Sequence, residues 1–198
     1  MYHLKKTCES EIEVKKSRFI GLLYPLENPE DASAIVAALR KKHYSASHFC
    51  TALRYSGIER SNDDGEPSST AGLPMLEVLR HHEVDNILAV VIRYFGGTLL
   101  GTGGLVRAYQ QAVNAALEVA TLTVPCQLSE YRITVPYELT NRVENLLAKE
   151  TITDRQYDEQ LTVNFLTERD LKDEFLALSQ GRCEPVFIRN VIIEKEIK

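Results

Sequence analysis

The residues with the clearest chemical signature form one glycine-rich segment, which runs from Arg93 to Arg107. Five glycines stand within nine residues, between an apolar run and a helical pattern. Glycine lets the backbone adopt positive φ and lets a ligand approach the main chain closely. A helix that begins after the glycines presents free N–H groups, which bind anions, and flanking arginines can add bidentate contacts to a phosphate. The predicted phosphate-binding residues are Arg93, Gly96, Gly97, Gly101, Gly103, Gly104 and Arg107, with Lys15, Lys16 and Arg18 as further cations.

The segment lacks the signatures of two common nucleotide-binding loops. No Gly-Lys-Ser/Thr follows, so it is not a P-loop, and Glu118, the acid at the right distance for a Rossmann fingerprint, falls in the same predicted helix. A tight turn with close packing of a helix on a sheet is the structural alternative to an anion site.

A second segment, from Ser61 to Gly72, is acidic and rich in small residues. Asp63, Asp64 and Glu66 place three carboxylates within four residues. Their oxygens could hold a hard cation, although the spacing is not that of a calcium loop. The alternatives are a solvated acidic turn, or a buried pairing of Arg93 with Asp63 or Asp64 that would make the two loops a structural clasp.

Catalytic and metal-binding patterns are otherwise weak. The four cysteines include no C-x-x-C pair, which in a chain of this type indicates reduced thiols and argues against a zinc site. His48 and Cys50 would share a face of a strand, but a buried small side chain is the simpler interpretation of Cys50. The sequence therefore predicts no catalytic residue, metal or cofactor, and it favours a binding protein over an enzyme.

The elements that must position these segments indicate an α+β protein of two domains, 1–125 and 126–198. In the first, strands are predicted at Glu11–Lys15, Arg18–Tyr24, 48–55 and Ile87–Phe95, forming a mixed sheet. A helix start is predicted at Asn28-Pro29, and further helices at Leu76–Arg80 and about 104–120.

The second half predicts the order βαββαβ of the ferredoxin-like fold. Its strands are expected near 131–135, 151–157, 160–166 and Pro185–Glu194. One helix follows Pro136; another begins at an N-cap, Thr167, and ends near Gly181.

Composition excludes some classes of protein. The net charge of −5 and the pI of about 5.6 do not fit a simple basic coat for nucleic acid, although a local basic face remains compatible with them. No apolar run approaches the ~18 residues of a membrane-spanning helix, and the first residues lack a signal-peptide pattern. A cytoplasmic location is expected.

Several motifs resemble the IMPACT/YigZ family over about residues 15–120: Lys16-Ser17-Arg18-Phe19-Ile20, Ala46-Ser47-His48-Phe49-Cys50, Asn62-Asp63-Asp64-Gly65-Glu66-Pro67, Thr70-Ala71-Gly72-Leu73-Pro74-Met75-Leu76, and the glycine-rich segment itself. The second half is similar to the shorter carboxyl-terminal domain of bacterial-type members. Ser69 stands where glycine is expected in the acidic loop.

The resemblance implies a first domain with the β-α fold of domain IV of elongation factor G and the GHMP sugar kinases. It implies a second domain like domain V of the same factor. Eukaryotic relatives regulate the translational stress response, with an additional amino-terminal domain that this sequence does not contain. The family has no settled enzymatic activity.

Three functional hypotheses follow. The first is a translation-associated regulatory protein that binds RNA or the ribosome through the glycine-rich, arginine-flanked loop. The second is a Mg²⁺-dependent enzyme acting on a phosphorylated or nucleotide small molecule, with Asp63, Asp64 or Glu66 on the metal. The third is a protein adaptor that regulates a translation factor.

Overall fold

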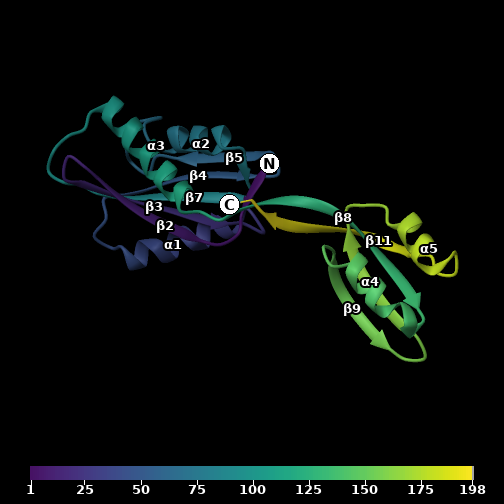
Figure 1. Ribbon diagram of the computed structural model, residues 1–198. Helices are drawn as coiled ribbons and strands as arrows, with labels where there is room; N and C mark the ends of the chain where they lie inside the picture. The colour runs from purple at the N-terminus through teal and green to yellow at the C-terminus, as the bar shows by residue number, and fades with distance from the viewer. Residues whose placement is uncertain (198) are drawn as a thin grey trace. The chain divides into compact units, whose positions relative to one another are not determined.

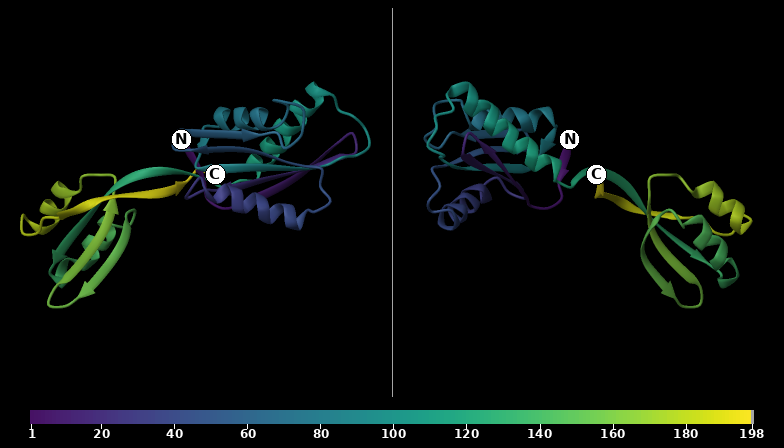
Figure 2. Two further views of the ribbon diagram at one scale, coloured as in Figure 1. Left: turned by 180° about the vertical axis from the view of Figure 1, so that it is seen from behind. Right: turned by 60° about the vertical axis from the view of Figure 1, so that its left-hand side comes forward.

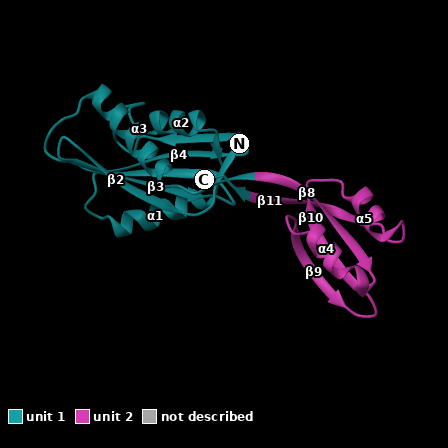
Figure 3. Ribbon diagram, viewed as in Figure 1, with its two compact units in different colours: residues 1–124, 195–198 teal, residues 125–194 magenta. Residues whose placement is uncertain are grey.

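The computed structural model describes residues 1–197, which form two compact units of α+β structure (Figure 3). The first comprises residues 1–124 with the last residues from Lys195, and the second comprises residues 125–194. The chain enters the second unit within strand β8 (Leu122–Val135) and returns within β11 (Val186–Glu196), so each of these two strands belongs to both units.

The first unit is built on a five-stranded sheet in the order β2-β3-β7-β4-β5. Every neighbouring pair in this sheet is antiparallel, so it is not the mixed sheet predicted for this half; a parallel pairing in the first unit, of Tyr2–Leu4 with Val84–Asp85, belongs to the other sheet. The strands are β2 (Cys8–Val14), β3 (Ser17–Pro25), β4 (His48–Tyr55), β5 (Ile58–Asn62) and β7 (Ile87–Tyr94).

Helices cover both faces of this sheet (Figure 2). α2 (Gly72–His81) and α3 (Thr102–Glu118) pack on one face, and α1 (Asp31–Lys42) packs on the other. The central strand β7 is therefore buried from Ile87 to Arg93. This arrangement explains the uninterrupted apolar run in the sequence, because a strand covered on both sides has no polar face.

The helix boundaries differ from the predicted ones at the amino-terminal ends. Asn28 accepts a hydrogen bond from the Glu30 N–H at 3.0 Å, and α1 begins only at Asp31. α2 is longer than the predicted Leu76–Arg80, because Asp63 from another segment holds its first turn. The short strand β1 (Tyr2–Leu4) pairs in parallel with β6 (Val84–Asp85) and antiparallel with the start of β8.

The second unit has the order strand, helix, strand, strand, helix, strand. Its sheet runs β11-β8-β10-β9, and a one-turn η1 (Tyr137–Leu139) leads into α4 (Thr140–Leu146). The remaining elements are β9 (Thr151–Tyr157), β10 (Leu161–Thr167) and α5 (Lys172–Ser179). Its core gathers residues predicted to face inward, among them Ile133, Val135, Val143 and Phe175.

The predicted N-cap of the last helix is wrong. Thr167 accepts the Arg169 N–H at 3.0 Å in a local turn, and α5 begins five residues later, after Leu171. A threonine side chain can satisfy a nearby N–H in a turn as well as in a helix cap, so the pattern alone does not separate the two. α5 ends at Ser179, where Gln180 adopts the left-handed conformation (φ +56°), and Gly181 follows with φ +79° and donates its N–H to the Leu176 carbonyl at 2.7 Å.

Within residues 1–197, no helix is both long and apolar enough to cross a membrane.

Candidate functional site

The glycine-rich segment connects β7 to α3 and packs against the β2–β3 turn, at one end of the first unit (Figure 1). A Cβ on Gly96 would lie 2.0 Å from the carbonyl carbon of Lys16, so only glycine fits this contact. The Gly96 N–H also donates to Ser17 Oγ at 3.1 Å. Lys15 and Lys16 both adopt positive φ in the tight turn. The fold thus brings these lysines, far away in sequence, beside the glycines.

The start of α3 lies on the same surface. Gly101 (φ +74°) precedes the helix, and within residues 1–197 no side chain caps its first N–H groups. Arg107 Nη1 lies 3.7 Å from the position of a Cβ on Gly103, so its guanidinium reaches back over the first turn. Lys15, Gly104 and Arg107 line one hollow with a volume of about 200 Å³. Positive charge and free N–H groups together favour an anion here.

Arg18 is placed differently from the lysines. Its guanidinium lies 4.5 Å from the centre of the Tyr94 ring and 3.6 Å from the Glu11 carboxylate, and about half of its side chain is exposed. Arg18 therefore lies beside the segment but shares its charge with Glu11.

Arg93 lies in the protein interior, unlike the other cations. Its Nη1 donates to Glu66 Oε1 at 2.6 Å, and 6% and 3% of the two side chains are exposed. The guanidinium carbon lies 5.5 Å from the Phe19 ring centre and 5.6 Å from that of Phe95. A buried arginine–carboxylate pair joins the two loops, and the acid is Glu66 rather than Asp63 or Asp64.

Further polar groups surround Glu66 on the buried side. The Tyr109 hydroxyl donates to the same Oε1 at 2.7 Å, and Cys50 Sγ donates to Tyr109 at 3.3 Å. His48 Nε2 lies 3.9 Å from Glu66 Oε1, while its Nδ1 is 2.8 Å from the Asp64 carbonyl. Tyr109 is not among the predicted site residues, although a tyrosine on the inward face of a helix signals a buried hydroxyl that needs a partner.

Burial raises the pKa of the Cys50 thiol from 9.0 to about 12, and the nearby Glu66, Asp64 and Asp63 carboxylates act in the same direction. A thiol held in its neutral form is a poor nucleophile. His48 and Cys50 share one strand, yet Cys50 is fully buried and its hydrogen bonds go to Tyr109 and the Asp63 carbonyl. This geometry gives no support to a catalytic Cys–His pair.

Asp63 holds the start of α2. Its carboxylate accepts the N–H groups of Ser69 at 2.8 Å, Ala71 at 3.0 Å and Gly72 at 2.8 Å. Ser69, at the position where the family resemblance suggested glycine, adopts φ +61°. The serine accommodates this left-handed conformation while its N–H is hydrogen-bonded to Asp63.

Asp64 is likewise engaged by the protein. It accepts the Phe49 N–H at 2.6 Å and pairs with Arg40. Across residues 1–197 there is no group of three His, Cys, Asp or Glu side chains arranged to hold a metal ion. The oxygens of Asp63, Asp64 and Glu66 thus serve different protein partners.

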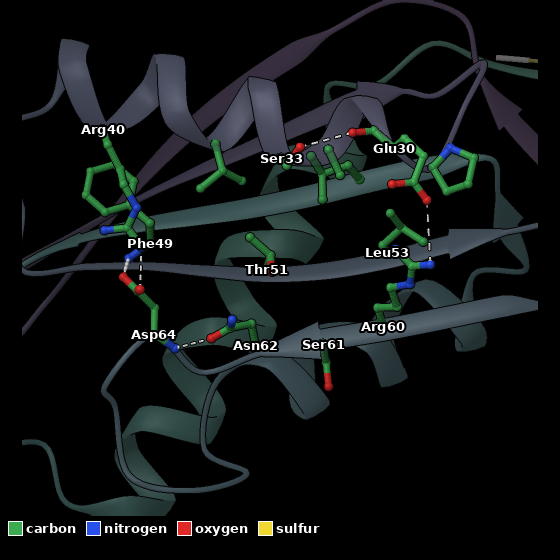
Figure 4. Close-up of a pocket in the computed structure, with 14 residues that line it drawn as sticks. Glu30, Ser33, Arg40, Phe49, Thr51, Leu53, Arg60, Ser61, Asn62 and Asp64 are labelled. Carbon is green, nitrogen blue, oxygen red and sulfur yellow. Dashed lines mark hydrogen bonds and ion pairs between the residues drawn. The ribbon is translucent and has the colours of Figure 1, made fainter.

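A larger groove lies between α1 and strands β4 and β5 (Figure 4). Its volume is about 720 Å³, and Phe49 and Leu53 are among the apolar residues that line it. Arg40 pairs with Asp64 toward one end, and Arg60 lies 3.9 Å from Glu30 toward the other. Since each arginine has an acidic partner, the groove offers less uncompensated positive charge than the α3 surface. No sequence pattern predicts this groove, because its lining comes from four separate segments.

Comparisons with known proteins match most of the chain. Residues 15–117 match the family described as the Impact N-terminal domain. The chain is 44% identical over 142 residues to the IMPACT family member YigZ of Escherichia coli, covering 69% of this chain and 70% of that protein. It is 38% identical over 149 residues to YvyE of Bacillus subtilis, covering 74% and 69%. A crystal structure described as a hypothetical protein is similar over 95% of this chain and 97% of that one, with 34% identity and a TM-score of 0.61.

Proposed function

The chain belongs to the IMPACT family, and from that membership we propose that it is a translation-associated regulatory protein that binds RNA or the ribosome. The surface proposed for this binding consists of Lys15, Lys16, the glycine-rich segment 96–104 and Arg107, and is called the loop surface below. Arg93 supports this surface from beneath through Glu66.

The single observation that carries the proposal is the meeting of Lys15, Arg107 and Gly104, in the first turn of α3, around one hollow. Two cations beside the amino-terminal end of a helix attract an oxyanion. Nucleic acids offer regularly spaced phosphates, and such contacts position a protein on RNA without reading its sequence. This local positive face is compatible with a net charge of −5, because short-range contacts are set by the nearest charges.

The fold relationships that we propose for the two units also favour a role in translation. We assign the second unit to the ferredoxin-like class, because its element order and its sheet order β11-β8-β10-β9 fit that fold. The similarity of the two units to domains IV and V of elongation factor G stays a proposal drawn from the family resemblance.

Co-sedimentation with ribosomes, at about 50 and 200 mM salt, tests the function. Binding through phosphates weakens steeply with salt, and each lost contact lowers the log–log salt slope by about one. The double variant Lys15→Glu/Arg107→Glu should abolish sedimentation with ribosomes. The matched control Lys149→Glu/Arg155→Glu changes one exposed lysine and one exposed arginine in the second unit and should bind as the wild type does.

Two results would contradict the proposal. A folded Lys15→Glu/Arg107→Glu variant that binds ribosomes unchanged would remove the loop surface from the interaction. Binding that is insensitive to salt and survives nuclease treatment of the sample would favour the adaptor hypothesis, in which the partner is a protein. The Mg²⁺-enzyme hypothesis draws no support from the geometry, because Asp63, Asp64 and Glu66 are occupied by protein donors.

A further inference from the structure

We propose that the loop surface binds unpaired nucleotides, with one base stacking on the ring of Phe95 while neighbouring cations hold the phosphates. This inference rests on the proposed function and specifies the form of RNA that is bound. Three features of the structure support it: the exposure of Phe95, the fixed backbone at this residue and the cations near it.

Phe95 is an apolar side chain left in water at the end of a buried strand. Half of its surface is exposed, whereas Ile87 to Ile92 before it are entirely or almost entirely buried. Single exposed apolar side chains are ordinary on protein surfaces, so a role for Phe95 depends on the groups that surround it.

The backbone that carries Phe95 is fixed on two sides. Its N–H donates to Ser47 Oγ at 3.2 Å, and the next N–H, of Gly96, donates to Ser17 Oγ at 3.1 Å. The Arg93 guanidinium lies 5.6 Å from the ring centre and backs it from the protein side. A ring held in this way loses little conformational entropy when a ligand stacks on it.

Cations and further aromatic groups belong to the same end of the first unit. The backbone of Lys16 lies against Gly96, the residue after Phe95, and Arg18 packs on the Tyr94 ring. Tyr44, which is 88% exposed, belongs to the connection between α1 and β4 that also carries Ser47. Aromatic rings interleaved with lysine and arginine are typical of surfaces that bind single-stranded nucleic acid.

The exposed ring of Phe95 should bind unpaired nucleotides more tightly than a duplex. In an A-form duplex the bases are already stacked on each other, so an external ring cannot reach their faces. A single strand or a loop leaves the π face of each base free, and stacking on an aromatic side chain tolerates any base. We therefore expect binding with little sequence preference and a clear preference for unpaired RNA.

Fluorescence anisotropy with two labelled RNAs tests this inference: a 12-nucleotide oligouridylate and a blunt duplex of 12 base pairs. Phe95→Ala should weaken binding of the single strand about tenfold, the effect of losing one stacked base, and leave duplex binding unchanged. Tyr157→Ala removes an exposed ring from the second unit (60% exposed) and should change neither affinity.

A tryptophan substitution supplies an independent readout. The chain contains no tryptophan, so Phe95→Trp introduces a single indole at the site and preserves stacking. Its fluorescence should be quenched when the oligouridylate is added, whereas Tyr157→Trp should show no quenching.

The outcomes separate this inference from the proposed function. Salt-sensitive binding of both RNAs that Phe95→Ala leaves unchanged would overturn the stacking and leave the phosphate surface standing. A wild-type protein that binds neither RNA nor ribosomes would overturn both. Loss of both RNAs in Lys15→Glu/Arg107→Glu, together with selective loss of the single strand in Phe95→Ala, would support both.

Discussion

Arg93 Nη1 lies 2.6 Å from Glu66 Oε1, with both side chains almost completely buried. This pair connects the end of β7 to the loop after β5, so the two segments that carry the motifs of the family hold each other in place. The guanidinium lies close to the Phe19 and Phe95 rings. Arg93 thereby fixes the base of the loop surface, while Arg107 and Lys15 line a hollow on it.

Removing one member of this pair should destabilise the protein strongly. Glu66→Gln or Arg93→Met leaves a buried charge without its partner, which costs about 3–5 kcal/mol in the free energy of unfolding. Urea denaturation followed by circular dichroism measures this change. Glu184→Gln, which breaks the exposed pair with Lys172, serves as control and should leave stability nearly unchanged, because exposed ion pairs contribute little.

The double variant Glu66→Gln/Arg93→Met distinguishes a charge effect from a loss of packing. Because it removes both charges, its loss of stability should be clearly smaller than the sum of the two single losses. Additive losses would show that the two side chains contribute independently and would contradict the coupling described here.

Asp63→Ala should unfold the start of α2. The carboxylate accepts three N–H groups, from Ser69, Ala71 and Gly72, and the loss of a helix cap costs about 0.5–2 kcal/mol. Hydrogen exchange at Ala71 and Gly72 should accelerate more than exchange within α3. Asp158→Ala, an exposed acid in the second unit, is the matched control. Unchanged exchange at Ala71 and Gly72 would show that water replaces the cap without cost.

The sequence was informative where the structure depends on local patterns. The apolar run of β7, the glycines before α3 and the alternation in β10 all correspond to elements near the predicted places. The partner of Arg93 depends on the fold: the sequence points to Asp63 or Asp64, whereas the folded geometry brings Glu66 under β7. The N-cap predicted at Thr167 is wrong because the Thr167 hydroxyl accepts a local hydrogen bond from the Arg169 N–H instead.

The thiol of Cys50 should resist modification in the folded protein. Its pKa is raised from 9.0 to about 12, chiefly by burial, so little thiolate exists near pH 8. A thiol reagent in excess should label Cys8, Cys126 and Cys183, which are partly exposed, and react with Cys50 only after unfolding. Mass spectrometry of the labelled peptides identifies the sites. Rapid labelling of Cys50 without unfolding would contradict its burial.

The same shift gives a pH dependence with a defined sign. A group whose pKa is higher in the folded state favours folding fully below its unshifted pKa, here 9.0, and this contribution is lost as the pH rises toward 12. The stability difference between the wild type and Cys50→Ala should therefore shrink as the pH is raised from 8 to 11. Urea titrations of both proteins at each pH measure it, and a constant difference would argue against the raised pKa.

Two neighbouring glycines should respond differently to alanine. At Gly96 a Cβ would lie 2.0 Å from the Lys16 carbonyl carbon, so Gly96→Ala must push the β2–β3 turn away from the segment. At Gly97 the structure between residues 1 and 197 has no atom within 4 Å of the new Cβ, and only the φ of +80° opposes the change. Gly97→Ala should lower the free energy of unfolding by about 1–2 kcal/mol through backbone strain alone.

Gly96→Ala should lower the free energy of unfolding further. It should also shift the amide resonances of Lys16 and Ser17 in two-dimensional NMR spectra, whereas Gly97→Ala should leave these resonances in place. If Gly96→Ala kept those resonances unmoved, the close contact that brings the lysines to the glycines would be absent, and the loop surface would lose its structural basis.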